Sequence, residues 1–345
     1  FSFPGHGRAR AAPPYPAAPA PRAPSLSPFP LPLPFRLFSP SPADLVASAP
    51  YHAGSAGLTL PARSPVQRGE VANRILSVGD QARAGALAAL LDPAPGGAEP
   101  FRRESSRGFV TYTGRFQGVP VSIVATLMGM ANMDFVVREN RAVVDAPMAM
   151  VRLGSCGLLR PPAHLGGLAV AREALCCRRN PDAFDAPAGP DAPDPYQLTR
   201  PIPADPALRV ALADALRQEL GDSEVFEGTN VTADSFYSSQ GRLSDHFDDR
   251  NADLLDSIVK RHPEALSLEM ESFHLLDLAR SSQGSLRAAV CAIGFAERWT
   301  NAFLEPERVR VLELAGGRAA LETLAGADVP LNPLEGGASG VWDGL

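Results

Sequence analysis

Short apolar runs alternate with longer segments of helical periodicity from Ile75 onward. The runs are bounded by polar residues and glycines, as is typical of buried strands. We expect strands at residues 74–78, 121–126, 148–153 and 288–293, and helices at residues 82–91, 134–146, 206–220, 251–261 and 271–281. This alternation predicts an α/β domain with a largely buried sheet, so site residues are expected on loops at the strand ends.

The pattern is absent from both ends of the chain. Residues 1–48 are rich in proline, alanine and serine and have no acidic residue before Asp44, so we expect them to be disordered. Their arginine content is typical of an organelle transit peptide, but their proline density argues against an amphipathic helix, and an untargeted tail is equally compatible. One domain is expected at residues 52–325, with a long surface excursion at 178–206 and a flexible tail at 326–345.

Composition excludes several classes of protein. The 345 residues are 45% hydrophobic and carry a formal charge of −6, so they can bury a core but offer no cationic footprint for nucleic acid. Four cysteines without zinc-like spacing predict neither disulfides nor a metal site. No apolar segment approaches the roughly 20 residues that cross a bilayer, so no membrane partner is expected. We expect a cytoplasmic enzyme-sized domain, with organelle import as the alternative.

The segment FYSSQGR at residues 236–242 combines an aromatic ring, an amide and a guanidinium. The Gln240 amide has an acceptor and donors, whereas Arg242 has donors only, so together they complement a ring edge with alternating C=O and N–H groups. Uracil has such an edge, and Phe236 can pack beside it. An ordinary polar loop is the alternative interpretation of this segment alone.

Two other loops carry groups suited to an oxyanion. Gly79 follows an apolar run and allows close approach of the backbone, while Arg83 supplies a bidentate guanidinium. Arg152 ends another apolar run and precedes Gly154 and Ser155, so side-chain and amide donors can surround a phosphate. A structural ion pair is the alternative for an isolated arginine.

The triplet Glu269-Met270-Glu271 opens a helical pattern. Glu271 can accept hydrogen bonds from vicinal sugar hydroxyls, and Met270 offers a polarizable surface beside a sugar. Alone, the triplet is equally the acidic first turn of a helix, which the helix dipole favours.

Taken in order, GDQAR at 79–83, RLGSCG at 152–157, the 236–242 segment and EMES at 269–272 resemble the nucleoside phosphorylase family, and most closely its uridine phosphorylase branch. The resemblance implies a single-domain fold with a mixed central β-sheet flanked by helices. It implies reversible phosphorolysis of uridine to uracil and ribose 1-phosphate in pyrimidine salvage, without cofactor or metal and with inorganic phosphate as co-substrate. It also implies a ring-shaped hexamer built from dimers.

The resemblance assigns roles to individual residues of this chain. Phosphate binding is assigned to Gly79, Arg83, Arg107, Arg152 and Ser155. Ribose binding is assigned to His52, Met270 and Glu271. Base binding is assigned to Phe236, Gln240 and Arg242. We expect Arg152, Gln240, Arg242 and Glu271 to be catalytic, and Arg107 to reach the phosphate of a neighbouring subunit, with a surface arginine as the alternative.

Three residues depart from the family pattern. Gln81 stands where the family typically has proline, and Leu127 replaces a glycine near the expected sugar pocket. Gly108 replaces a glutamate that helps bacterial uridine phosphorylases bind a monovalent cation, so the resemblance does not extend to that cation site. The run at 293–298 lacks the Ser-Asp pair of purine-specific relatives and ends in Arg298, which favours uridine. A purine nucleoside phosphorylase, a nucleosidase or a non-catalytic storage protein of the same fold are the alternatives.

Overall fold

The computed structural model describes residues 66–185, 192–332 and 339–344. The expected N-terminal segment 1–48 and the candidate ribose ligand His52 lie outside these residues. The domain described below therefore begins at Val66.

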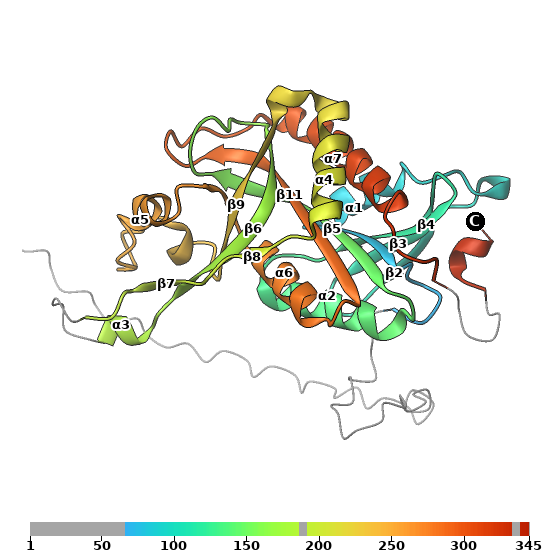
Figure 1. The fold of residues 1–345 in the computed structure, drawn as a ribbon, viewed down its shortest axis with the longest axis horizontal. Coiled ribbons are helices and arrows are strands. Elements are labelled where there is room, and N and C mark those ends of the chain that lie inside the picture. The colour runs from blue at the N-terminus through green and yellow to red at the C-terminus, as the bar shows by residue number, and fades with distance from the viewer. Residues whose placement is uncertain (1–65, 186–191, 333–338, 345) are drawn as a thin grey trace, which may run out of the picture. The chain divides into compact units, whose positions relative to one another are not determined.

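The described strands form one mixed sheet of eleven strands (Figure 1). They are β1 (Arg74–Val78), β2 (Phe101–Glu104), β3 (Val110–Phe116), β4 (Val119–Ala125), β5 (Met148–Leu158), β6 (Leu168–Arg179), β7 (Tyr196–Leu198), β8 (Ile202–Pro203), β9 (Val225–Ala233), β10 (Ala265–Glu269) and β11 (Leu286–Glu297). Their order is β10-β9-β6-β11-β5-β1-β4-β3-β2, and β7 and β8 pair with β6.

Two features of the topology build the site. Strands β4, β1, β5 and β11 run parallel, so their carboxyl ends lie along one edge of the sheet. Strand β10 pairs with β9 and also with the end of β5, where Leu268 lies opposite Gly157. This second pairing closes β5, β11, β6, β9 and β10 into a ring and brings the end of β10 beside β5.

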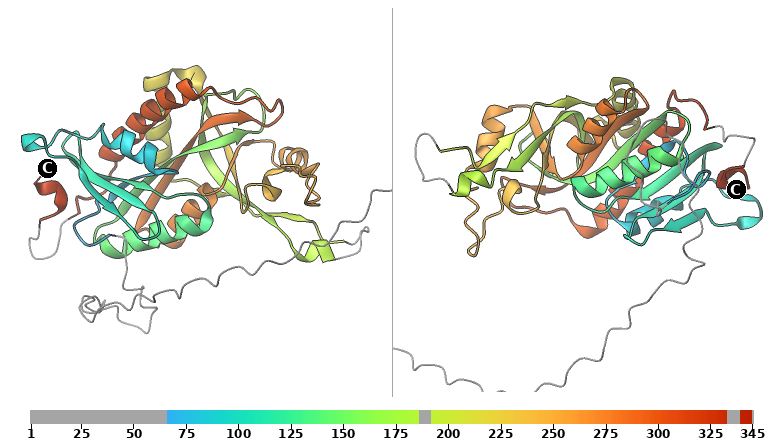
Figure 2. Two further views of the ribbon diagram at one scale, coloured as in Figure 1. Left: turned by 180° about the vertical axis from the view of Figure 1, so that it is seen from behind. Right: turned by 90° about the horizontal axis from the view of Figure 1, so that it is seen from below.

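Helices cover both faces of the sheet (Figures 1 and 2). The described α-helices are α1 (Gln81–Ala88), α2 (Met130–Val143), α3 (Asp182–Asp185), α4 (Pro206–Leu220), α5 (Leu254–Arg261), α6 (Ser272–Ser281) and α7 (Pro306–Ala325). Short 3₁₀ helices are η2 (Pro95–Gly97), η3 (Asp222–Glu224), η4 (Ser238–Gln240) and η6 (Val341–Asp343). Helices α1, α4 and α7 share one core cluster with the sheet, whereas α2 and α6 share another on the opposite face.

The alternation of side chains along β5 explains the two cores. Ala149, Val151 and Leu153 pack in the cluster of α1, α4 and α7, whereas Met148 and Met150 pack in the cluster of α2 and α6. Successive side chains of a strand point to opposite faces, and a strand covered on both faces is apolar throughout. The next residue on the α2–α6 side is Arg152, a buried charge that needs partners.

The α/β class and the mixed sheet flanked by helices are confirmed. The four predicted strands correspond to β1, β4, β5 and β11, and the five predicted helices to α1, α2, α4, α5 and α6. Helix α2 begins earlier than predicted, directly after Gly129, which has a φ of 97°. The predicted excursion at 178–206 contains the end of β6 and the short elements α3, β7 and β8.

Parts of the expected C-terminal tail pack on the domain. Val329 and Trp342 are buried. The Arg74 guanidinium donates to the Val329 carbonyl at 2.7 Å, and Arg115 Nε donates to the Trp342 carbonyl at 2.9 Å. None of the helices in the described ranges is long and apolar enough for a membrane span.

Candidate active site

A cavity of about 500 Å³ lies at the carboxyl ends of β1, β4, β5 and β11. Loops after β9 and β10 complete its wall. Its lining residues are Gly79, Asp80, Arg83, Leu127, Met128, Arg152, Ser155, Cys156, Gly157, Phe236, Gln240, Arg242, Leu268, Glu269, Met270, Glu271, Phe295, Ala296 and Phe303. A cleft at this edge of an α/β sheet is where such folds bind ligands.

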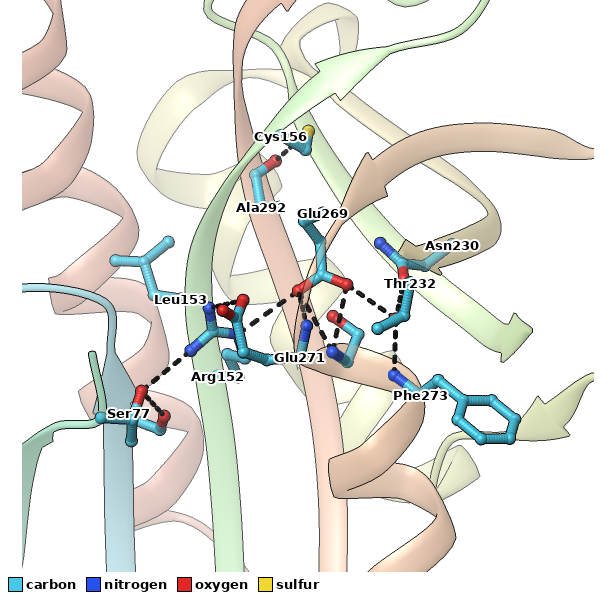
Figure 3. Close-up of polar contacts among 12 residues, drawn as sticks. Ser77, Arg152, Leu153, Cys156, Asn230, Thr232, Glu269, Glu271, Phe273 and Ala292 are labelled. Atoms are coloured by element: carbon cyan, nitrogen blue, oxygen red, sulfur yellow. Dashed lines mark hydrogen bonds and ion pairs between the residues drawn. The ribbon is translucent and has the colours of Figure 1, made fainter. Parts of the chain in front are cut away.

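Arg152 lies between two buried carboxylates (Figure 3). Its Nη2 donates to Glu271 Oε2, and its Nη1 donates to Thr126 Oγ1 at 3.2 Å. Its Nε lies 3.6 Å from Glu269 Oε2 and has no hydrogen-bond partner among the described residues. The guanidinium is therefore held by carboxylates on two sides, and it lines the cavity.

Glu269 fixes the start of α6. Its carboxylate accepts from Thr232 Oγ1 at 2.7 Å, from the Glu271 amide at 3.0 Å and from the Ser272 amide at 3.1 Å (Figure 3). The amides of Glu271 and Ser272 are among those that the first turn of a helix leaves without a backbone partner. Glu269 thereby sets the direction in which Glu271 leaves the backbone.

Glu271 is a buried carboxyl that also accepts from the Gly129 amide at the start of α2. Burial raises the pKa of Glu271 to about 7, the Arg152 guanidinium opposes this rise, and the Glu269 carboxylate adds to it. A carboxyl with such a pKa changes its charge near neutral pH, and only its ionised form accepts hydrogen bonds with both oxygens.

Arg83 and Gly79 line the part of the cavity near Arg152, which we call its oxyanion end. Arg83 Nε donates to Glu313 Oε1 of α7 at 2.8 Å, which holds the buried side chain in place. Asp80 caps α1 by accepting from the Arg83 amide at 2.8 Å. A Cβ added to Gly79 would meet no atom within 4 Å, so the space beside this backbone is open to an anion.

Another part of the cavity is lined by the amide of Gln240 and the guanidinium of Arg242, with Arg298 behind Gln240. Arg242 Nε donates to the Phe236 carbonyl at 3.0 Å, and its guanidinium lies 4.2 Å from the centre of the Phe236 ring. Arg298 Nη2 donates to the backbone carbonyl of Gln240 at 2.7 Å. Burial lowers the pKa of both arginines, and Arg242 lowers that of Arg298 further. Both remain cationic at neutral pH, so this end attracts partial negative charge.

The cavity thus offers three chemically different environments. Arginines and an open glycine backbone suit an oxyanion, Glu271 suits hydroxyl groups, and the amide and guanidinium beside Phe236 suit a flat heterocycle. Among the described residues, no three His, Cys, Asp or Glu side chains are grouped to hold a metal ion. Burial raises the pKa of Cys156 well above its usual range, which disfavours the reactive thiolate form.

The family model of the phosphorylase superfamily matches residues 73–321. The chain belongs to this superfamily. It is similar to the uridine phosphorylase of Thermococcus kodakarensis, with 30% identity over 68% of this chain and 76% of that protein. It is also similar to the guanosine phosphorylase of Halorubrum lacusprofundi, with 24% identity over 66% of this chain and 80% of that protein.

Solved structures agree with this membership. One from a study of two uridine phosphorylases of the oomycete Phytophthora capsici is 43% identical, with a TM-score of 0.71 over 79% of this chain and 95% of that chain. A Trypanosoma brucei nucleoside phosphorylase is 19% identical, with a TM-score of 0.62 over 75% of this chain and 94% of that chain. The latter likeness supports the phosphorylase fold alone.

Most of the predicted site residues of this phosphorylase line the one cavity. They are Gly79, Arg83, Arg152, Ser155, Phe236, Gln240, Arg242, Met270 and Glu271. Arg107 does not line it. The Arg107 guanidinium instead lies 4.8 Å from the centre of the Phe135 ring on α2, with Nη1 3.4 Å from Glu139 Oε1.

Several lining residues of the cavity were not predicted as site residues, and three of them are informative. Glu269 belongs to the predicted triplet, and its burial and four hydrogen bonds reveal its role only in the structure. Phe295 lies in the run at 293–298. That run was informative only through its lack of a Ser-Asp pair and its terminal arginine, so Phe295 itself was not predicted. Phe303 reaches the cavity because Phe303 and Ala296 form a β-bridge, and no local pattern indicates that contact.

Proposed function

We propose that the chain is a uridine phosphorylase, a pentosyltransferase that converts uridine and phosphate reversibly to uracil and ribose 1-phosphate. The observation that carries this proposal is the cavity in which Arg152 contacts Glu271 and which Gln240 and Arg242 also line. The two relatives described as uridine phosphorylases, at 30% and 43% identity, support the same choice of substrate.

In the proposed reaction, Arg83, Arg152, Ser155 and the Gly79 backbone hold the phosphate dianion below the ribose C1′. A phosphate oxygen forms the new bond to C1′ as the C1′–N1 bond breaks, and the bonding electron pair leaves with uracil. Catalysis then depends on positioning and electrostatics, without a covalent enzyme intermediate. Arg152 contacts Glu271 directly, so one guanidinium can bridge the phosphate and sugar positions.

Glu271 would accept hydrogen bonds from the 2′- and 3′-hydroxyls, which strengthen as the ribose gains oxocarbenium character. Met270 would pack beside the ribose. Gln240 and Arg242 would bind the O2, N3 and O4 edge of uracil, with Phe236 beside the ring. Negative charge that develops on the departing uracil would be stabilised by Arg242, with Arg298 behind Gln240 adding positive charge.

We further propose that the active enzyme is a hexamer built from dimers that share their sites. Arg107 would reach the phosphate of the neighbouring subunit, and His52 would lie near a ribose 5′-hydroxyl. The absence of Arg107 from the lining of its own cavity is compatible with this role. The proposed reaction uses inorganic phosphate as co-substrate and no cofactor. Four free, buried cysteines support a reducing compartment, cytoplasmic unless residues 1–48 direct import.

A substrate panel tests the proposal. Purified protein is incubated with phosphate and with uridine, inosine or guanosine at equal concentrations, and base release is measured. We expect kcat/KM for uridine to exceed that for either purine nucleoside. A preference for inosine or guanosine would assign the chain to purine nucleosides instead. No release from any nucleoside by the folded oligomer would indicate a storage-type protein.

A further inference from the structure

The three residues that depart from the family pattern, Gln81, Gly108 and Leu127, lie against one another. Gln81 Nε2 donates to the Gly108 carbonyl at 2.7 Å. A Cβ built on Gly108 would lie 3.7 Å from Leu127 Cδ1 and 3.8 Å from Gln81 Nε2. The first residue of α1, the β2–β3 turn and the β4–α2 loop thus meet directly after Arg107.

The turn itself is tight and depends on glycine. The Gly108 amide donates to the Ser105 carbonyl at 3.0 Å, and the Phe109 amide donates to Ser105 Oγ at 3.0 Å. Gly108 has a φ of 86°, a conformation that side chains disfavour. The turn therefore has its own hydrogen bonds, but these fix only its shape. Gln81 is the polar side chain that ties its carbonyl to α1.

Leu127 supplies the apolar contact at an energetic cost. It has a φ of 58°, a backbone conformation that is unfavourable for a residue other than glycine. Leu127 also lines the cavity and packs on the core cluster of α2 and α6. Leu127 therefore lies beside both the Gly108 turn and the cavity.

The opposite side of the turn is held by α2. The Arg107 guanidinium lies over the Phe135 ring and beside Glu139, whose side chain is buried and whose Oε2 has no partner among the described residues. Gln81 directly follows Asp80, which lines the cavity at its oxyanion end. Contacts from α1, from the β4–α2 loop and from α2 therefore hold the Arg107 turn at the rim of that end.

We infer that Gln81, Gly108 and Leu127 form a clasp that positions Arg107, and that Gln81 is a positioning residue for phosphate binding in this enzyme. The inference rests on the proposed function, in which Arg107 contacts the phosphate of a neighbouring copy. The amide of Gln81 fixes the turn, and the turn fixes the direction of Arg107. Of these groups, Arg107 alone meets the phosphate.

A double-mutant cycle tests the inference. Gln81→Met keeps the side-chain length and removes the donor, and the exposed Gln218→Met on α4 is the matched control. We expect Gln81→Met to raise the phosphate KM and the calorimetric phosphate Kd about threefold to tenfold, with the uridine KM and Tm unchanged. In an Arg107→Ala background we expect Gln81→Met to have no further effect, because Gln81 acts through Arg107.

Three results would contradict the inference that Gln81 positions Arg107. One is an unchanged phosphate Kd in Gln81→Met. Another is an equal effect of Gln81→Met with and without Arg107, which would mean that Gln81 acts through α1. The last is a lower Tm with equal changes for both substrates, which would mean a structural role only. If the unaltered protein binds phosphate but does not cleave uridine, the proposed function fails. The phosphate Kd values of the variants then still test whether Gln81 acts through Arg107. If it binds no phosphate, both fail.

Discussion

At the scale of single residues, the contact between Arg152 and Glu271 joins the two halves of the proposed reaction. Arg152 is buried, and the structure surrounds it with Glu271, Glu269 and Thr126. A buried guanidinium is stable only with such partners. Arg152 also lines the cavity, so its position there is set by these partners.

Substitutions should separate the two ends of the cavity. Arg152→Ala is expected to raise the phosphate KM about 10- to 100-fold, because it removes a charged donor. Arg242→Ala is expected to lower kcat/KM for uridine by a similar factor with little change in phosphate binding. Steady-state kinetics with each substrate varied in turn measures both effects. Arg200→Ala, at an exposed site, is the control. Equal loss of phosphate affinity in both cavity variants would contradict this division of roles.

Protonation of Glu271 should weaken uridine binding. Since burial raises the pKa of Glu271 to about 7, the protonated fraction grows as the pH falls through that value. A protonated carboxyl loses acceptor capacity toward the two ribose hydroxyls. We expect the uridine Kd, measured by calorimetry without phosphate, to rise below this pH, and that of 2′-deoxyuridine to rise less. A uridine Kd that stays constant through this range would argue against the role of Glu271.

At the scale of elements, the cavity depends on β5 and β11 lying close together near their ends. A Cβ on Gly157 would lie 2.7 Å from Arg298 Cδ and 3.0 Å from Arg298 Cγ, so the arginine stem passes directly over the glycine. That path allows Arg298 Nη2 to reach the Gln240 carbonyl. The glycine in β5 thus helps to hold the base end of the cavity in place.

Gly157→Ala tests this arrangement. The added methyl group must displace Arg298, so its hydrogen bond to Gln240 should be lost. We expect the uridine KM to rise about tenfold and the phosphate KM to remain unchanged, since one charged hydrogen bond is removed at the base end. Gly326→Ala is a suitable control, because its backbone has a φ of −82° and the nearest atom would lie 3.5 Å away. A larger rise in the phosphate KM than in the uridine KM would contradict the placement of Arg298 at the base end.

The sequence predicted the elements whose apolar periodicity is strong and missed those that depend on tertiary contacts. Helix α7 is rich in alanine, glycine and charged residues, so its periodicity is weak. Its glycines are explained only by packing, since a Cβ on Gly317 would lie 2.1 Å from Leu87 Cδ2. Strand β9 contains the buried polar residues Thr229, Asn230 and Thr232, which obscure an apolar run.

The residues of the candidate site likewise divide into those that the sequence could predict and those that depend on tertiary contacts. Gln240, Arg242 and Glu271 could be predicted because each lies in a short motif with its chemical partners nearby in the sequence. Phe303 could not, because it reaches the cavity through a bridge to Ala296. Nor could the sequence place Arg107 against α2, since that depends on its contact with Phe135.

At the scale of the whole molecule, the proposal requires a second copy of the chain. Arg107 lies outside its own cavity, and its turn is held at the rim of the oxyanion end. In a dimer with twofold symmetry, each copy would donate Arg107 to the other. Activity should then belong to the assembly, and the isolated chain should bind phosphate weakly.

Mixing of variants tests site sharing. Arg107→Ala and Arg152→Ala subunits, each nearly inactive alone, should regain up to about a quarter of the original activity when unfolded and refolded together, because one site of each mixed dimer is complete. Arg152→Ala mixed with Glu271→Ala is the control, since every mixed site then lacks one group. No recovery in the first mixture, despite mixed oligomers in native mass spectrometry, would exclude sharing through Arg107.

The central claim is that one cavity joins phosphate to the ribose of uridine. The most direct measurement is uracil release from uridine by the purified protein, with phosphate present and with phosphate omitted. We expect release only with phosphate, accompanied by an equal amount of ribose 1-phosphate. Equal release without phosphate would mean hydrolysis, and no release from uridine in either condition would contradict the assigned substrate.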